Sequence, residues 1–332
     1  MRCGRSLTRL RCAGGRAIGG SRHREGPYRL QTASRRTVYL LLGLVMLLWS
    51  GNSIVARAIH AEVPPFTLAF LRWGGASLIA LPVAWRHIVA DRAEIRRHWL
   101  VILLLGMIGV GSFNGFLYSG LQYTTAANSL LVQAAIPALV LLFDLMLFRT
   151  RPRLAQIAGC IIAAAGVAVI IFRADPAAVG QMSFNKGDLL VLCAILLWAL
   201  YTVLLRIRPA IHALSFLALT ILIGALAMAP FAAVELQSRT ILLSPGVYAG
   251  IAYVTIFPSI IAYFLFNWSV EQIGAGDAGQ VINLQPLFGA LLASLLLGEP
   301  FHLYHIAGMV LILIGIAIPL FARPVRTVAR ER

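Results

Sequence analysis

The fold is decided by two stretches of similar pattern, LAQIAGCIIAAAGVAVIIF at residues 154–172 and LYHIAGMVLILIGIAIPLF at residues 303–321. The second follows the first by 149 residues, and at this offset two pairs of glycines coincide, Gly159 with Gly308 and Gly166 with Gly315. Each stretch is apolar and has about the 20 residues that a helix needs to cross a bilayer. The pair therefore predicts an internal repeat of transmembrane helices.

The same offset extends outward to residues that rarely coincide by chance. Trp49 falls on Trp198, Arg57 on Arg206 and Pro137 on Pro286; only the second span slips, where Pro82 matches Pro230 at an offset of 148. Apolar spans are predicted at 38–58, 65–85, 99–121, 126–148 and 154–172, and again at 187–206, 212–234, 246–268, 276–297 and 303–321. Because five is an odd number, the second half is predicted to be inverted relative to the first.

Composition agrees with this pattern. The chain has 332 residues, of which 60% are hydrophobic and only 12% are charged, and its mean hydropathy is +0.85. A soluble domain of this length would not carry so much apolar surface. We expect an all-α polytopic membrane protein with ten transmembrane helices in two inverted five-helix repeats, and the lipid bilayer as a partner.

The net charge of +16 is compatible with nucleic-acid binding, but the cations sort by side of the membrane. If the N-terminus is cytoplasmic, the cytoplasmic tails and loops hold 23 of the 28 cations, whereas the other side holds three, Arg173, Lys186 and Arg239. This asymmetry predicts that both termini are cytoplasmic. The same distribution argues against a nucleic-acid partner. Arginine makes up 27 of the 28 cations, which suggests a GC-rich bacterial genome and therefore the bacterial inner membrane.

The predicted organisation has four parts. Residues 1–36 form a disordered Arg-rich cytoplasmic tail, 37–173 and 186–322 the two repeats, and 323–332 a basic cytoplasmic tail. The first tail also resembles an organelle transit peptide, could contact anionic lipids, or could follow from a mis-assigned start codon. The four cysteines imply neither a disulfide nor a metal site.

Polar residues recur every four positions in several predicted helices, and residues at i and i+4 share a helix face. Such faces line either a hydrophilic passage or helix–helix contacts held by hydrogen bonds, and the sequence leaves both open. The candidate pathway residues are Trp49, Asn52, Ser53, Arg72, Asn114, Tyr118, Asn128, Trp198, Tyr201, Thr202, Tyr263, Asn267, Gln280 and Asn283.

Charged residues in or near the spans suggest more specific roles. Arg72 lies well inside the second span, where it either gives an outer vestibule a positive field or bonds carbonyl groups of the first helix. Asp144 is expected to form an interfacial ion pair with neighbouring arginines. Glu271 and Asp277 flank a short connection and are expected to be solvated. No acid lies clearly at mid-membrane, so the coupling ion is left open.

Two prolines and two histidines are the remaining candidates for special roles. Pro137 and Pro286 each remove a helical hydrogen bond and are predicted to kink their helices at matching depth. His302 and His305 lack enough neighbouring acids for a metal site. We expect no catalytic residue, no metal and no cofactor, and the chain has no Walker A sequence.

One family pattern covers most of the chain. The closing segment LGEPFHLYHIAGMVLILIGIAIPL at 297–320, WSGN at 49–52, the pair Pro64 and Pro65, and the following Phe70-Leu71-Arg72 together resemble EamA-type proteins of the drug/metabolite transporter superfamily. Gly298 and Glu299 depart from the symmetry, since Arg149 and Thr150 stand at the matching positions of the first half. The resemblance implies a carrier of small organic solutes that works by alternating access.

The predicted function is therefore secondary export of a small-molecule solute, either amino acid-like or amphipathic. An exchanger of phosphorylated or nucleotide-linked sugars is an alternative, but it calls for several deep cations. An intramembrane lipid-modifying enzyme is a third possibility, disfavoured because no cluster of nucleophile, base or metal ligands stands out.

Overall fold

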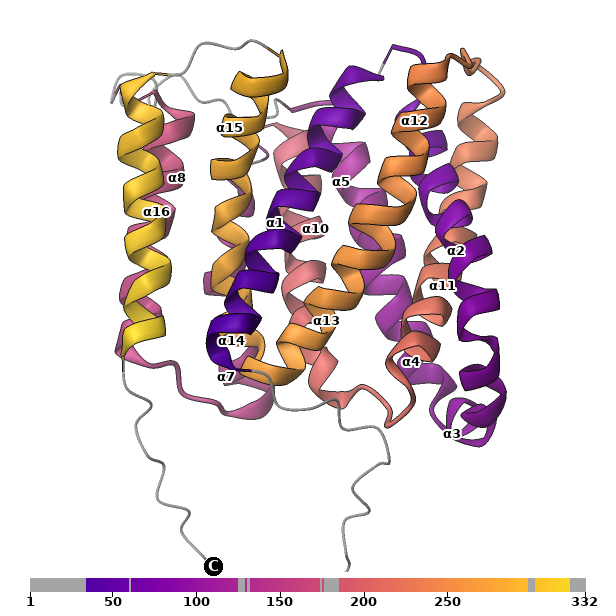
Figure 1. The fold of residues 1–332 in the computed structure, drawn as a ribbon, viewed down its shortest axis with the longest axis horizontal. Helices are drawn as coiled ribbons and strands as arrows, with labels where there is room; N and C mark the ends of the chain where they lie inside the picture. The colour runs from indigo at the N-terminus through magenta and orange to yellow at the C-terminus, as the bar shows by residue number, and fades with distance from the viewer. Residues whose placement is uncertain are drawn as a thin grey trace, which may run out of the picture.

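Antiparallel helices make up the structure (Figure 1). The computed structural model describes residues 34–59, 61–124, 129, 132–173, 175, 185–297 and 302–322. Within them, nine helices are long and apolar enough to cross a membrane, and the shorter apolar helix α7 fills the second part of the remaining predicted span. The prediction of an all-α membrane protein with ten spans is confirmed.

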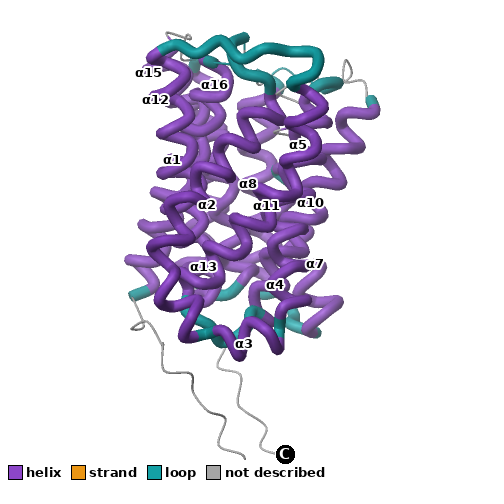
Figure 2. Tube along the Cα trace, turned by 90° about the vertical axis from the view of Figure 1, so that its right-hand side faces the viewer, coloured by secondary structure: helices purple, strands orange, loops and turns teal. Residues whose placement is uncertain are grey.

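The first half contains α1 (Arg35–Ala58), α2 (Pro65–Ala90), α3 (Arg92–Arg97), α4 (Trp99–Gly106), η1 (Met107–Ser112), α5 (Phe113–Leu121), α7 (Ile136–Phe148) and α8 (Leu154–Ile171). The second half contains α10 (Lys186–Leu204), η2 (Leu205–Ile207), α11 (Ala213–Glu235), α12 (Pro245–Val254), η3 (Thr255–Ile261), α13 (Ala262–Ile273), α14 (Ala275–Gln280), η4 (Val281–Asn283), α15 (Leu284–Leu297) and α16 (Leu303–Phe321). Most of the loops lie at the two ends of the bundle (Figure 2).

Helix α1 begins inside the predicted N-terminal tail. The Ser34 hydroxyl accepts a hydrogen bond from the Thr37 backbone N–H at 3.2 Å, so Ser34 caps the helix and Arg35 starts it. Residues 1–33 and 323–332, which contain the rest of both predicted tails, lie outside the described residues. The start of α1 and the end of α16 lie at the same end of the bundle (Figure 1). We refer to this end as the cytoplasmic end, following the predicted topology.

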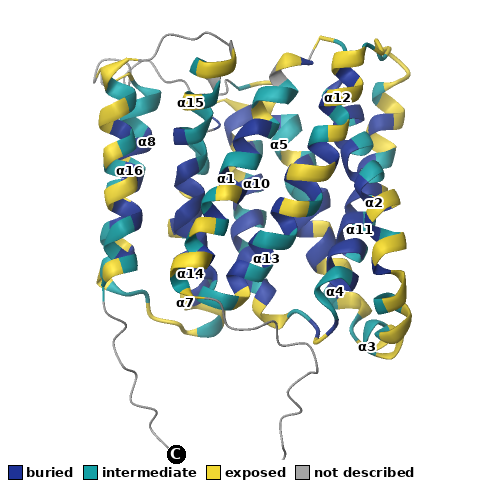
Figure 3. Cartoon of the chain, viewed as in Figure 1, coloured by how far each residue is buried: buried dark blue, intermediate teal, exposed yellow. Residues whose placement is uncertain are grey.

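Each half inserts its first helix into the other half. Helix α1 packs against α13 and α15 of the second repeat, and α10 packs against α5 and α7 of the first. The two peripheral pairs, α2 with α11 and α8 with α16, also join one helix from each repeat. Buried residues concentrate in the middle of the bundle, and the exposed faces look outward toward the position of lipid (Figure 3). The repeats are therefore interlocked rather than separate domains.

Glycines explain the contact between α8 and α16. A Cβ atom placed on Gly315 would lie 2.6 Å from the Gly159 carbonyl oxygen, and one on Gly166 would lie 2.6 Å from the Gly308 carbonyl oxygen. Real Cβ atoms do not approach so closely, so only glycine permits these contacts. Gly159 and Gly308 are equivalent at the 149-residue offset, and so are Gly166 and Gly315. Each of the two contacts is therefore the symmetry equivalent of the other, as inverted repeats require.

The pair formed by α2 and α11 is fastened at both ends by acids. At the outer end, Glu235 accepts hydrogen bonds from the Thr67 backbone N–H at 2.7 Å and from the Thr67 hydroxyl at 2.9 Å. At the cytoplasmic end, Asp91 accepts from the His212 backbone N–H at 2.9 Å and from the Ser215 hydroxyl at 2.8 Å. In each case a carboxylate stabilises the positive N-terminal end of the opposite helix.

Irregular backbone also recurs in both halves. The third and eighth spans each contain a π-helical segment, η1 and η3, at matching positions. The fourth and ninth spans are interrupted just before Pro137 and Pro286, by a turn at residues 134–135 and by the 3-10 segment η4. Proline lacks the N–H that would continue the hydrogen-bond ladder. The predicted kinks thus take the form of helix breaks, with the prolines in the first turn of α7 and α15.

Candidate functional site

The centre of the bundle is closed by aromatic rings from three helices. Trp49 of α1 lies with its ring centroid 5.3 Å from that of Trp198 in α10 and 5.7 Å from that of Tyr263 in α13. The rings of Trp198 and Tyr263 are 5.6 Å apart, and Phe266 contacts both tryptophans. The contacts among the tryptophans and Tyr263 are edge-to-face, a favourable geometry for aromatic pairs. We call Trp49, Trp198, Tyr263 and Phe266 the aromatic plug.

Hydrogen bonds tie the plug to the π-helical segments. The Trp49 indole N–H donates to the Pro258 carbonyl in η3 at 3.1 Å, and the Tyr263 hydroxyl donates to the Gly109 carbonyl in η1 at 3.2 Å. Gly109 and Pro258 occupy equivalent positions of the two repeats. The π-helical turns, common at functional sites, therefore present backbone acceptors to the plug.

Arg72 is buried among protein groups, whereas one of the two sequence-based hypotheses placed it in an outer vestibule. Its side chain is buried, its Nε donates to the Ser259 hydroxyl at 2.5 Å, and its guanidinium lies 4.4 Å from the centre of the Trp73 ring. Ser259 in turn donates to the Val254 carbonyl at 2.7 Å, the group that Pro258 leaves without an N–H partner. Arg72 thus supports the π-helical turn at Pro258. The sequence also allowed carbonyl groups of the first helix as partners of Arg72. In the structure its hydrogen-bond partner is instead the Ser259 hydroxyl of the eighth span.

The remaining predicted pathway residues divide into three groups. The Tyr201 hydroxyl donates to Asn267 at 2.8 Å beside the plug. The side chains of Asn114 and Thr202 are buried and bond to backbone carbonyls of their own helices, at 2.6 and 2.8 Å, which fits the alternative of structural hydrogen bonding. Ser53 is exposed, Asn52 and Tyr118 are half-buried, and Asn128 and the side chain of Arg57 lie outside the described residues.

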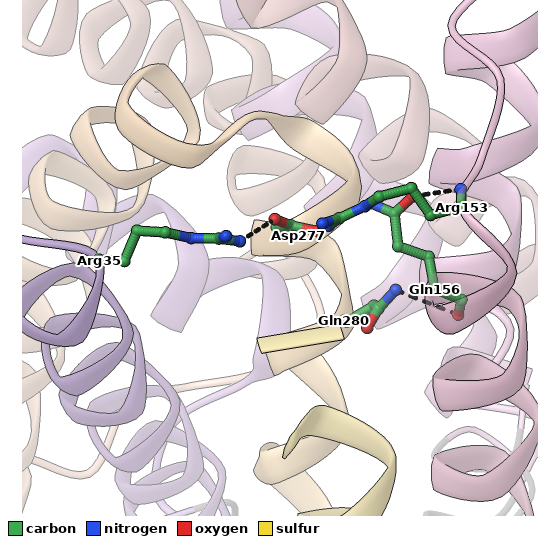
Figure 4. A network of polar contacts seen from close by, with 5 residues as sticks. All are labelled: Arg35, Arg153, Gln156, Asp277 and Gln280. Carbon is green, nitrogen blue, oxygen red and sulfur yellow. Dashed lines mark hydrogen bonds and ion pairs between the residues drawn. The ribbon is translucent and has the colours of Figure 1, made fainter. Parts of the chain in front are cut away.

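A second polar cluster lies at the cytoplasmic end (Figure 4). Asp277 of α14 is only 6% exposed and accepts hydrogen bonds from Arg35 of α1 at 2.7 Å, from Gln156 of α8 at 2.8 Å, and from Arg153. Gln280 completes the group by donating to the Gln156 carbonyl at 3.2 Å. We call these five residues the cytoplasmic ion cluster. The expectation that Asp277 is solvated is wrong, because three donors from the first half of the chain converge on this carboxylate of the second repeat.

Sequence reasoning missed Arg35, Arg153 and Gln156 as members of a site. In the sequence, Arg35 and Arg153 resemble the other basic residues of the cytoplasmic side, and Gln156 resembles an ordinary polar residue of a helix surface. No neighbouring residue marks them as members of a site. The spacing of Arg153 and Gln156 at a helix start is a weak indication. The Arg153 backbone N–H donates a hydrogen bond to the Gln156 side chain at 2.9 Å. At the matching positions of the second repeat, the His302 backbone N–H donates to the His305 ring at 3.0 Å. These histidines therefore cap α16, and no cluster of three metal-ligating residues occurs in the described part of the chain.

Other ionic contacts also close the cytoplasmic end. Arg206 pairs with Asp144 at 2.9 Å across the repeats, in place of the neighbouring arginines that the sequence suggested. Arg208 pairs with Glu271 at 2.7 Å. The His87 and His212 rings stack with centroids 3.6 Å apart. Partial burial, together with the nearby His87, lowers the pKa of His212 below its ordinary value.

Comparison with known proteins agrees with this architecture. The chain matches the EamA-like transporter family twice, at residues 36–172 and 185–321, and the two matches are offset by the same 149 residues as the glycines. It is 26% identical to an uncharacterized transporter, YyaM, of Bacillus subtilis over 84% of this chain and 92% of that protein. It is 28% identical to an uncharacterized transporter of Archaeoglobus fulgidus, over 84% of this chain and 95% of that one.

Two further comparisons extend the range of relatives. The chain is 26% identical to the inner membrane protein YtfF of Escherichia coli, over 85% of this chain and 94% of that protein. A solved crystal structure covers 86% of this chain and 97% of its own with a TM-score of 0.67 at 23% identity, which shows a shared fold. Because the family model matches twice and together the two matches cover most of the chain, the chain belongs to the EamA-like transporter family.

Proposed function

We propose that this membrane transporter is a secondary exporter that moves a small amino acid-like or amphipathic solute by alternating access. It acts in the bacterial inner membrane with both termini in the cytoplasm. The observation that carries the proposal is the aromatic plug, which closes the centre of two interlocked inverted repeats with side chains from both of them. A passage blocked at such a point must open by relative motion of the repeats.

The ionic contacts support a closed cytoplasmic end. The pairs of Asp277 with Arg35 and Arg153, and of Asp144 with Arg206, each join the first repeat to the second. Opening toward the cytoplasm requires these pairs to separate, since they hold together the helix ends that surround the centre. The two carboxylates of these pairs are buried, so leaving them without a partner is costly, and the contacts favour the present conformation.

The helix breaks supply places where such motion can occur. Pro137 and Pro286 interrupt the fourth and ninth spans at equivalent depth, and backbone freed from the helical ladder bends more easily. Both breaks lie beside the central helices rather than at the periphery. The alternative of a phosphorylated-sugar exchanger gains no support, because it calls for several deep cations and the one deep arginine, Arg72, is engaged by Ser259 and Trp73.

Flux through reconstituted protein tests the proposal. Liposomes that contain the full chain are loaded with leucine, phenylalanine, 4-methylvalerate or ethidium, and efflux is compared with protein-free liposomes. We expect saturable efflux of at least one solute without chemical conversion. Trp198→Ala should raise passive efflux about tenfold or more, because the smaller side chain opens the plug, whereas Trp99→Ala, at an exposed tryptophan of the cytoplasmic end, should not. Absence of flux for every solute, or a covalent product, would contradict the proposal.

A further inference from the structure

The cytoplasmic ion cluster has an unbalanced charge. Two arginines, Arg35 and Arg153, share the single carboxylate of Asp277, and no second acid among the described residues pairs with either of them. The N-terminal end of the 18-residue helix α8, where Gln156 is the third residue, adds partial positive charge at the same place. The cluster therefore lacks one negative charge.

Unused hydrogen-bonding groups lie in the same cluster. The Tyr39 hydroxyl, one helical turn after Arg35 in α1, is enclosed; the Arg35 guanidinium beside it can only donate, so the Tyr39 O–H proton has no acceptor among the described residues. Oε1 of Gln280 likewise has no donor among the described residues. Tyr39 lies within electrostatic reach of Arg35, Asp277 and Arg153. A buried polar group without a partner is unfavourable, so a ligand that supplies the partner gains by binding there. The cluster thus offers an unused hydroxyl donor beside an excess of positive charge.

The cluster is reachable from the cytoplasm. The side chain of Arg35 is 39% exposed and that of Arg153 is 24% exposed, whereas Asp277 lies behind them at 7%. A solute that arrives from this side meets the guanidinium groups first. Guanidinium binds carboxylate with two parallel hydrogen bonds, which makes it the most specific carboxylate receptor among the side chains.

We propose that the cytoplasmic ion cluster is the loading site for a solute that carries one carboxylate, an inference that rests on the proposed export function. The solute carboxylate binds Arg35 or Arg153 and accepts a hydrogen bond from Tyr39, while Asp277 keeps the other arginine. One carboxylate brings the net charge of the site to zero, whereas a dianionic phosphate leaves it negative. This balance selects a monocarboxylate.

Loading and opening are then coupled. In the closed conformation, Asp277 occupies the arginines and holds α1, α8 and α14 together. A solute carboxylate competes with Asp277 for the same donors, so it binds more tightly when the arginines are released. A ligand that prefers the released state shifts the population toward it. The solute itself therefore loosens the contacts that keep the cytoplasmic end shut.

Binding of matched carboxylates and amides tests this inference. Purified full-length protein in nanodiscs is titrated by calorimetry with leucine, phenylalanine and 4-methylvalerate, with the amide of each, and with inorganic phosphate. We expect at least one carboxylate to bind about tenfold or more tightly than its amide. Arg153→Gln and Arg35→Gln should bring this ratio close to one, and Arg153→Lys should keep part of it.

Neighbouring arginines provide the matched controls. Arg36 and Arg151 are exposed and form no ion pair with the described residues, so Arg36→Gln and Arg151→Gln should leave the ratio unchanged. Equal binding of acid and amide throughout the panel, tighter binding of phosphate than of any carboxylate, or a preference that survives both cluster variants would overturn the inference. If the liposomes show flux but no preference for carboxylates, only the loading-site inference is overturned. If solutes bind but no flux occurs, the proposed export function is contradicted.

Discussion

Gly315 of α16 faces Gly159 of α8 so closely that a Cβ on the former would lie 2.6 Å from the carbonyl oxygen of the latter. Gly308 and Gly166 repeat the contact with the roles of the helices exchanged. Two identical close approaches in one helix pair show that the symmetry of the repeats extends to individual backbone atoms. In lipid, where no hydrophobic effect drives helices together, such close packing holds the pair.

Gly315→Ala is expected to destabilise the protein, because the methyl group must displace the backbone of α8. Overpacking of this kind costs about 1–3 kcal/mol. Thermal melting followed by fluorescence-detected size-exclusion chromatography measures it as a lower melting temperature. Gly43→Ala is the matched control, since nothing lies within 4 Å of a Cβ there. An equal effect of both substitutions would contradict the packing argument.

Arg72 and Ser259 are expected to act as one unit. Arg72→Gln and Ser259→Ala should each lower the melting temperature, because both remove hydrogen bonds that support the π-helical turn at Pro258. The double variant should lose less than the sum of the single losses, since the second substitution removes a contact that is already broken. Strict additivity in a double-mutant cycle would refute the link.

Pro286→Ala is expected to slow transport without harming the fold. Alanine restores the N–H that can bond the Ile282 carbonyl, so the break before α15 should tighten into continuous helix. We expect melting temperature and protein level to be preserved or raised and flux to fall several-fold. Pro82→Ala, in the peripheral helix α2, should leave flux unchanged. If both variants transport like the unmodified chain, the breaks are not needed for motion.

Asp277→Asn is expected to open the cytoplasmic end more often. Gln280 is buried behind the ion pairs, so Gln280→Cys in a chain without its four native cysteines reports access from the cytoplasm. Loss of the Asp277 charge should raise the rate of maleimide labelling in inside-out vesicles about tenfold. Glu271→Gln, which disturbs a pair within the second repeat, should change it little. An unaltered rate in Asp277→Asn would show that the cluster does not hold the end shut.

Acidification is expected to weaken the α2–α11 contact at the cytoplasmic end. His212 accepts a hydrogen bond from the Leu214 backbone N–H and faces His87, Asp91 and Arg208, and its pKa in the folded protein lies below its ordinary value of 6.5. Between these two pKa values the unfolded chain binds more protons than the folded one, so stability falls as pH drops below 6.5 and is unaffected well above it.

Thermal melts at pH 7.5 and 5.5 measure this effect. His212→Asn keeps an N-cap acceptor but removes the titrating group, so it should show a smaller loss of melting temperature on acidification than the unmodified chain. Identical pH dependence of the two proteins would exclude His212 as its source.

Most of the architecture could be predicted from the sequence. Length and hydropathy fix the spans, because every backbone polar group in lipid must be bonded within a helix. The 149-residue offset predicts inverted repeats, and the coincidence of Gly159 with Gly308 marks the contact helices. The aromatic plug was partly predicted as well, since Trp49 and Trp198 are rare residues at matching positions. These features follow from periodicity, composition and the internal repeat, which can be recognised without knowing which residues meet in space.

The partners of the charged residues were decided only by the tertiary structure. Asp277 looks like an ordinary loop acid in sequence, yet Arg35 and Arg153, from distant parts of the other repeat, enclose it. Arg72 looked available to a solute, yet Ser259 occupies it. Which charges meet depends on how the first helix of each repeat inserts into the other repeat. That arrangement follows from packing over the whole bundle, and no local pattern in the sequence records it.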